Sequence, residues 1–216
     1  KGLFIVHLRW CRVGAGAGDH RPAARRWLRL ALGRLLDLSH ESLPLQRLPS
    51  GQLQLDGWAL TFSHSDAIAV FAAASAEVVD PPRIGVDIES LDRPPPGERA
   101  CRRLLTGPEL EWWRAQPPAQ RQSAFLALWT AKEAAQKARG LGIWQGLPEL
   151  RPGPLGSRWQ AHWPQGGEVL ALQHRMLDGQ LLALAFPPDW PDSLPGSVAA
   201  IETDPRGVPL RQASEQ

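Results

Sequence analysis

Residues 125–140 show the clearest helical pattern in the chain. They combine Leu, Ala, Gln, Lys and Glu, which are good helix formers, and they finish at Gly140, a residue type that often ends helices. Trp129, Glu133 and Lys137 lie four residues apart, so a helix places them along one face. That spacing also fits an ordinary surface pair of Glu and Lys.

Residues 84–89 alternate between apolar residues and Gly, Asp or Glu, which is the period of a half-buried strand. The alternation places Asp87 and Glu89 on one face and Val86 and Ile88 on the other. Neighbouring carboxylates repel each other unless a cation lies between them. Mg²⁺ prefers such oxygen ligands, although a strand with a wet acidic face would show the same pattern.

A second long helix is predicted over residues 22–37. It carries an apolar stripe and a basic set of side chains, and by itself it could be a solvated amphipathic helix. The apolar positions are Leu28, Leu32, Leu35 and Leu36, and the basic ones are Arg21, Arg25, Arg26, Arg29 and Arg34.

The rest of the pattern predicts strands and one capped helix. Thr106 and Glu109 form a capping-box pattern before an apolar run, and Asp178-Gly179 indicates a hairpin turn. No regular element is predicted for residues 187–216. The predicted strands cover residues 3–10, 58–62, 68–74, 157–162, 169–174 and 180–186.

Composition changes this picture in one respect. The 216 residues are 43% hydrophobic and 21% charged, which is typical of a globular protein. Only three lysines occur among 24 basic residues, and two of them, Lys132 and Lys137, fall in the predicted helix over residues 125–140. Because Lys and Arg differ as phosphate ligands, this concentration suggests a specific use for the ammonium group.

Three segments in order resemble the motifs of the Sfp-type 4′-phosphopantetheinyl transferases. They are Leu60-Thr61-Phe62-Ser63-His64-Ser65-Asp66, Gly85-Val86-Asp87-Ile88-Glu89, and Trp129-Thr130-Ala131-Lys132-Glu133-Ala134 with Lys137. The resemblance covers roughly residues 21–142. It implies an α+β fold of two similar halves related by a pseudo-twofold, each with a small antiparallel sheet packed on a long helix.

The resemblance also implies a division of the chain. Residues 1–82 would form the N-terminal half, which takes coenzyme A, and residues 83–186 the C-terminal half, which carries the metal ligands and the helix. Residues 187–216 would form a tail. The segment 79–83, Val-Asp-Pro-Pro-Arg, provides the break between the halves.

The implied reaction is transfer of the 4′-phosphopantetheine group of coenzyme A to a serine hydroxyl of an apo acyl or peptidyl carrier protein, with release of 3′,5′-ADP. Mg²⁺ would be held by Asp87, Glu89 and Glu133. Glu133, or a water held by the metal ion, would be the general base. Lys137 would add positive charge at the phosphates, and Lys132 would assist the base or the leaving group. The resemblance assigns coenzyme A binding to Arg21, Arg25, Ser63, His64 and Lys137.

One segment departs from the family. Its usual Gly-Lys-Pro segment appears here as Gly51-Gln52-Leu53, without the basic side chain and the proline. Either the alignment slips, or Arg47 compensates, or the nucleotide end of coenzyme A is held differently.

Other classes of protein are less compatible with the sequence. No apolar run approaches the length of a membrane span, the first residues lack a signal-peptide pattern, and Cys11 and Cys101 show no metal or redox spacing. A cytoplasmic monomer that binds neither membrane nor nucleic acid is expected. The alternatives are another Mg²⁺-dependent phosphotransferase, or a non-enzymatic basic binding module that uses the arginine-rich helix.

Overall fold

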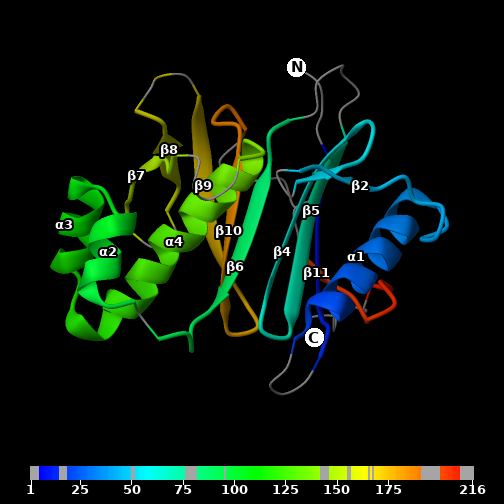
Figure 1. Ribbon diagram of the computed structural model, residues 1–216, viewed down its shortest axis with the longest axis horizontal. Helices are drawn as coiled ribbons and strands as arrows, with labels where there is room; N and C mark the ends of the chain where they lie inside the picture. The colour runs from blue at the N-terminus through cyan, green and yellow to red at the C-terminus, as the bar shows by residue number, and fades with distance from the viewer. Residues whose placement is uncertain are drawn as a thin grey trace, which may run out of the picture.

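The computed structural model describes residues 5–14, 19–49, 52–75, 82–94, 96–141, 146–154, 157–164, 166, 168–190 and 200–209. Two sheets lie in the middle of the molecule, with a long helix on either side (Figure 1). The mixed fold with antiparallel sheets confirms the predicted fold class.

The N-terminal sheet has the strand order β11-β1-β5-β4 and packs against helix α1 (Arg21–Leu36). It is antiparallel apart from the pair of β1 and β11. A separate ribbon of β2 (Gln46–Arg47) and β3 (Leu53–Gln54) lies beside it. The strands of the main sheet are β1 (Ile5–Arg12), β4 (Trp58–Ser65), β5 (Ile68–Ser75) and β11 (Ala200–Glu202).

The C-terminal sheet has the order β6-β10-β9-β8-β7, with every pair antiparallel. Asp178 and Gly179 both have positive φ in the turn between β9 and β10, which confirms the predicted hairpin. The strands are β6 (Gly85–Ser90), β7 (Glu149–Arg151), β8 (Trp159–His162), β9 (Val169–Leu177) and β10 (Gln180–Phe186).

Helix α4 (Arg121–Ala138) crosses this sheet and contacts β6, β9 and β10. It begins four residues earlier than the sequence pattern indicated, directly after a short 3₁₀ turn η1 (Pro118–Gln120). Helices α2 (Glu98–Leu104) and α3 (Gly107–Ala115) extend the same side of the sheet (Figure 1). The capping box at the start of α3 forms as predicted, with the Glu109 carboxylate accepting from the Thr106 N–H at 2.8 Å.

Strand alternation divides the apolar side chains among three cores. One lies between α1 and the N-terminal sheet, and another lies between α4 and the C-terminal sheet. The third joins the inner faces of the two sheets, where Val6 and Val70 meet Val86, Ile88 and other side chains. The predicted apolar face of β6 is therefore buried against the opposite half of the molecule.

The two sheets also meet edge to edge, where β4 lies beside β6 (Figure 1). Side-chain hydroxyls make this junction. Thr61 Oγ1 accepts from the Val86 N–H at 3.1 Å, and Ser65 Oγ accepts from the Ser90 N–H at 3.0 Å. Because strand residues alternate in direction, the intervening Ser63 hydroxyl also faces β6. We call these three hydroxyls the β4–β6 seam.

The C-terminal segment corrects one expectation. Residues 200–202 were expected to lack regular structure, but they form β11, which pairs in parallel with β1. Trp27 Nε1 also donates to Thr203 Oγ1 at 2.8 Å, so α1 is tied to this segment.

The division at residues 82 and 186 and the pseudo-twofold relation stay predictions. Among the described residues, no helix is long and apolar enough to cross a membrane.

Candidate active site

The candidate active site forms where helix α4 approaches strand β6 closely. Gly85, at the start of β6, permits this approach, because a Cβ atom there would collide with the Ala134 carbonyl group of α4. A larger residue would push the helix away from the strand. The glycine therefore helps to bring the polar face of α4 against the acidic face of β6.

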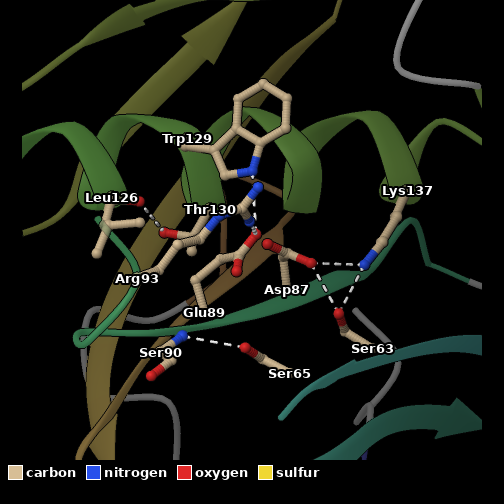
Figure 2. A network of polar contacts seen from close by, with 10 residues as sticks. All are labelled: Ser63, Ser65, Asp87, Glu89, Ser90, Arg93, Leu126, Trp129, Thr130 and Lys137. Carbon is tan, nitrogen blue, oxygen red and sulfur yellow. Dashed lines mark hydrogen bonds and ion pairs between the residues drawn. The ribbon is translucent and has the colours of Figure 1, made fainter. Parts of the chain in front are cut away.

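Asp87, on β6, lies at the centre of a three-residue polar cluster (Figure 2). Its Oδ1 atom accepts from Lys137 Nζ at 2.7 Å and from Ser63 Oγ at 2.7 Å, and Lys137 Nζ also donates to Ser63 Oγ at 2.9 Å. The other oxygen, Oδ2, is buried and accepts from no fixed donor within the described residues. Such an oxygen can still accept a cation or a proton.

Glu89 lies two residues further along β6 and is held in a similar way. Its Oε1 atom accepts from Arg93 Nη1 at 2.6 Å and from Trp129 Nε1 at 3.1 Å (Figure 2). Burial and the nearby Asp87 raise the pKa of Glu89, while Arg93 and Trp129 act in the opposite direction. Each carboxylate of β6 is thus bound through one oxygen by one cation and one neutral donor.

Glu133 completes the acidic group from the helix. Burial and the charges of Asp87 and Glu89 raise the pKa of Glu133 to about 8, although Lys137 lowers it. The carboxylates of Asp87 and Glu133 disfavour each other's charge, because like charges that lie close together repel. The fold therefore brings Glu133 near Asp87, Glu89 and Lys137, and the roles that the resemblance implies for these residues stay predictions.

A cleft of about 670 Å³ opens beside this cluster. It lies between α1, the β2–β3 ribbon, strand β4 and the C-terminal end of α4. Its polar lining includes three arginines and the groups at the end of α4, while leucines and Phe62 form apolar walls. The polar and charged lining residues are Arg25, Arg29, Gln46, Arg47, Gln52, Thr61, Ser63, His64, Glu133, Gln136 and Lys137.

The residues predicted to bind coenzyme A are distributed around this cleft. Ser63, His64 and Arg25 line it. Arg21 is not part of the lining, but its charge, together with burial, Lys137 and Arg25, lowers the pKa of His64. His64 is therefore neutral near pH 7, and an anion bound beside it would favour the protonated imidazole.

Two residues of the segment that departs from the family, Gln52 and Leu53, line the cleft. Gly51 is outside the described residues, but Gln52 and Arg47 both line the cavity. The Gln52 side chain lies against Gly140, after the end of α4. Arg29 has a structural role in addition, since its guanidinium donates to the carbonyl oxygens of His40 and Leu43 at 3.1 and 3.0 Å.

Lys132 does not reach the candidate site, which corrects the prediction that it assists the reaction. Its side chain is 1% exposed and forms an ion pair of 2.8 Å with Glu109, while Nζ donates to the Pro148 carbonyl oxygen at 2.6 Å. One residue corresponds to about 100° of rotation on a helix, so Lys132 points into the C-terminal core when Glu133 faces the cleft.

Sequence reasoning missed Arg93 as a partner of the site. It lies in the loop after β6, and no periodic pattern identifies a loop residue that turns back onto its strand.

Within the described parts of the chain, no group of three or more His, Cys, Asp or Glu side chains is already arranged to hold a metal ion. The charge of Asp87 acts on Glu133, whereas Glu89 is engaged by Arg93 and Trp129.

Comparison with known proteins identifies the central part of the chain. Residues 83–163 match the model of the 4′-phosphopantetheinyl transferase superfamily. This segment contains β6, α4 and the carboxylates described above. The match covers less than half of the chain, so it shows a similarity of this segment to that superfamily. Membership of the Sfp-type subfamily stays a prediction.

Individual relatives agree with this match. The putative 4′-phosphopantetheinyl transferase slr0495 of Synechocystis sp. is 25% identical over 173 residues, covering 74% of this chain and 68% of that protein. The 4′-phosphopantetheinyl transferase HetI of Nostoc sp. is 34% identical over 87 residues, or 40% of this chain and 35% of HetI. The holo-[acyl-carrier-protein] synthase of Vibrio cholerae is 43% identical over 70 residues, or 30% of this chain and 53% of that protein.

Proposed function

We propose that this protein transfers the 4′-phosphopantetheine group of coenzyme A to a serine hydroxyl of an apo acyl or peptidyl carrier protein and releases 3′,5′-ADP. The supporting observation is the cleft whose lining includes Ser63, Glu133 and Lys137, next to Asp87, in a chain whose residues 83–163 match the superfamily. It combines basic groups for phosphates with a carboxyl group that can accept a proton.

The cleft suits coenzyme A in its distribution of charge. Arg25, Arg47 and Lys137 provide three cationic groups, and His64 can become a fourth when a phosphate lies beside it. The apolar walls formed by residues such as Leu28 and Phe62 suit a nucleobase or a pantetheine chain. We place the phosphates at the basic groups and the reacting pyrophosphate at the Lys137 end.

The carboxylates of this end fit a divalent cation such as Mg²⁺. The donor set is made of oxygens, and the buried Oδ2 atom of Asp87 has no fixed donor among the described residues. The repulsion that raises the pKa of Glu133 would also be relieved by a cation. Asp87 and Glu133 would hold the ion, with Glu89 as a further ligand. When bound there, it would neutralise negative charge on the pyrophosphate.

The residues of the chain then divide the work of the reaction. The carrier serine oxygen forms a bond with the β-phosphorus, and the bond from that phosphorus to the bridging oxygen breaks. The bridging oxygen and its electron pair leave with 3′,5′-ADP. Glu133 accepts the serine proton in its ionised form, which a bound cation would favour. Lys137 adds positive charge next to the phosphates.

Intact-mass spectrometry of apo carrier proteins tests this proposal. Each carrier is incubated with the protein, coenzyme A and Mg²⁺, with and without EDTA. The expected product is a carrier that has gained one phosphopantetheine group, and EDTA should prevent its formation. Peptide-synthetase, polyketide and fatty-acid carriers should be compared.

The Glu133→Gln variant supplies the matched control, because it keeps the size of the side chain and removes its ability to accept a proton. We expect transfer to fall by at least about a hundredfold. Retention of near-normal transfer would remove Glu133 as base. Failure of every carrier, combined with no binding of coenzyme A in a calorimetric titration, would overturn the proposed function.

A further inference from the structure

Arg93 is the counter-ion of Glu89 and occupies one of its oxygens. Arg93 Nη1 donates to Glu89 Oε1 at 2.6 Å, and Trp129 Nε1 donates to the same oxygen at 3.1 Å. The Glu89 side chain is only 13% exposed, whereas that of Arg93 is 56% exposed. The arginine can therefore exchange this carboxylate for water, while Glu89 has no comparable route into solvent.

The main chain at Arg93 is well fixed despite its place in a loop. Its N–H donates to the Ser90 carbonyl oxygen at 3.2 Å, and its carbonyl oxygen accepts from Gln122 Nε2 at 2.7 Å. Gln122 also donates to the Leu91 carbonyl oxygen at 2.6 Å. Because Gln122 is part of α4, the helix that carries Glu133 also holds the loop that carries Arg93.

The pairing affects the charge available to a cation. With Lys137 on Asp87 and Arg93 on Glu89, two of the three carboxylates are already paired with a positive group. Glu133 forms no ion pair of its own among the described residues. The charge of Lys137, which pairs with Asp87, also lowers the pKa of Glu133. A divalent ion that uses Glu89 must compete with the guanidinium for the carboxylate and must tolerate its charge.

We infer that Arg93 competes with the divalent cation for Glu89 and so lowers the affinity of the free protein for metal. This inference rests on the cation site of the proposed function. As a consequence, the ion binds most tightly when the phosphates of coenzyme A are also bound. These phosphates supply negative charge in place of the Glu89 charge that Arg93 neutralises. Trp129 keeps Glu89 in place when the arginine leaves.

Titration with Mn²⁺, followed by the electron paramagnetic resonance signal of the free ion, tests this inference without any turnover. Removal of one positive charge near a divalent ion in a partly open site should tighten Mn²⁺ binding by about three- to tenfold in Arg93→Gln. The gain should shrink at high salt. Arg93→Lys, which keeps the charge, should stay within about twofold of the unsubstituted protein.

Arg102→Gln is the matched control. Arg102 pairs with Glu98 four residues earlier, as Arg93 pairs with Glu89, and it is similarly exposed at 62%. Its removal lowers the net charge equally but lies outside the site, so Mn²⁺ affinity should not change. A comparable gain in this variant would mean that only net charge matters, and the inference would be wrong.

A double-mutant cycle shows whether Glu89 is the point of competition. Glu89→Gln should weaken Mn²⁺ binding more in the Arg93→Gln background than in the parent protein, because Arg93 no longer masks the carboxylate. Additive effects, or unchanged or weaker binding in Arg93→Gln alone, would overturn the inference.

Asp87→Asn separates this inference from the proposed cation site itself. If the parent protein binds Mn²⁺ and Asp87→Asn does not, the cation site stands whatever Arg93 does. If the parent protein binds no Mn²⁺, or Asp87→Asn binds it equally well, both the site and the role of Arg93 are overturned.

Discussion

Lys132 and Lys137 lie on the same helix, α4, and each forms an ion pair with a carboxylate. The two pairs differ in their burial and in the other partners of the carboxylate. Lys132 pairs with Glu109 at 2.8 Å inside the C-terminal core, where the side chains are 1% and 0% exposed. Lys137 pairs with Asp87 at 2.7 Å beside the cleft, and its side chain is 31% exposed. The distances are nearly equal, so distance does not distinguish a structural pair from a functional one.

The difference lies in how completely each pair is satisfied. Glu109 accepts from Lys132, from the Thr106 N–H at 2.8 Å and from the Leu150 N–H at 2.6 Å. It therefore joins α4 to the start of α3 and to β7. Within the described parts of the chain, Asp87 keeps one buried oxygen without a fixed donor, and its charge acts on the carboxylate of Glu133. We call Lys132–Glu109 the closed pair and Lys137–Asp87 the open pair. The closed pair stabilises the fold, whereas the open pair leaves negative charge that a ligand can use.

The largest expected effect comes from breaking the closed pair. Lys132→Met should lower the free energy of unfolding by about 3–5 kcal/mol, because it leaves the buried carboxylate of Glu109 without its cation. Urea unfolding followed by tryptophan fluorescence measures this loss. Lys137→Met should lose less, since water can reach the open pair. Equal losses in the two variants would contradict the distinction between the two regions.

The open pair should instead control the reaction. Lys137→Met should lower kcat/KM for transfer by about a hundred- to a thousandfold, equivalent to about 2.7–4 kcal/mol, because it removes positive charge next to the phosphates. Mass-spectrometric assays of carrier modification measure the rate. Lys132 variants that stay folded at low temperature should keep most of the activity, and a similar loss in them would place Lys132 back in the mechanism.

The β4–β6 seam offers a smaller test with two serines on one strand. Ser63 and Ser65 each use their hydroxyl toward β6, but only Ser63 touches Asp87 and Lys137. Each change to Ala should lower the free energy of unfolding by about 1 kcal/mol, measured by thermal unfolding. Transfer activity should fall only in Ser63→Ala. A Ser65→Ala variant that loses as much activity would show that the seam matters as a whole.

The half-buried His64 and the buried His174 should give the smallest difference. Burial lowers the pKa of both His64, at the cleft, and His174, whose Nε2 bonds the Ala127 carbonyl oxygen in the closed core. Bound coenzyme A phosphate should raise the pKa of His64 by about one unit, because the dianion favours the imidazolium form. Binding should therefore take up protons and strengthen as the pH falls toward 6.5.

Proton NMR of the two imidazole rings, recorded as a pH titration with and without coenzyme A, measures this effect. The His174 signals should not respond to the ligand. A ligand-induced change at both histidines, or at neither, would remove His64 from the phosphate site.

Local sequence patterns were enough to predict the main helices and strands and the faces that they present. The spacing of Trp129, Glu133 and Lys137 defined one face of α4, and the alternation around Asp87 and Glu89 defined one face of β6. These features depend on backbone geometry within a few residues, which a local pattern records directly. The turn at Asp178-Gly179 and the capping box at Thr106 were predictable for the same reason.

The contacts between these faces, and the ion pair that each charged side chain forms, became apparent only from the tertiary structure. The approach of α4 to β6 at Gly85 joined Lys137 to Asp87, and the rotation of the helix sent Lys132 to Glu109 instead. The pairing of residues 200–202 with β1 was equally invisible in the local pattern. Such contacts join segments far apart in the sequence, and their partners are selected by how the cores pack, not by the spacing of neighbouring residues.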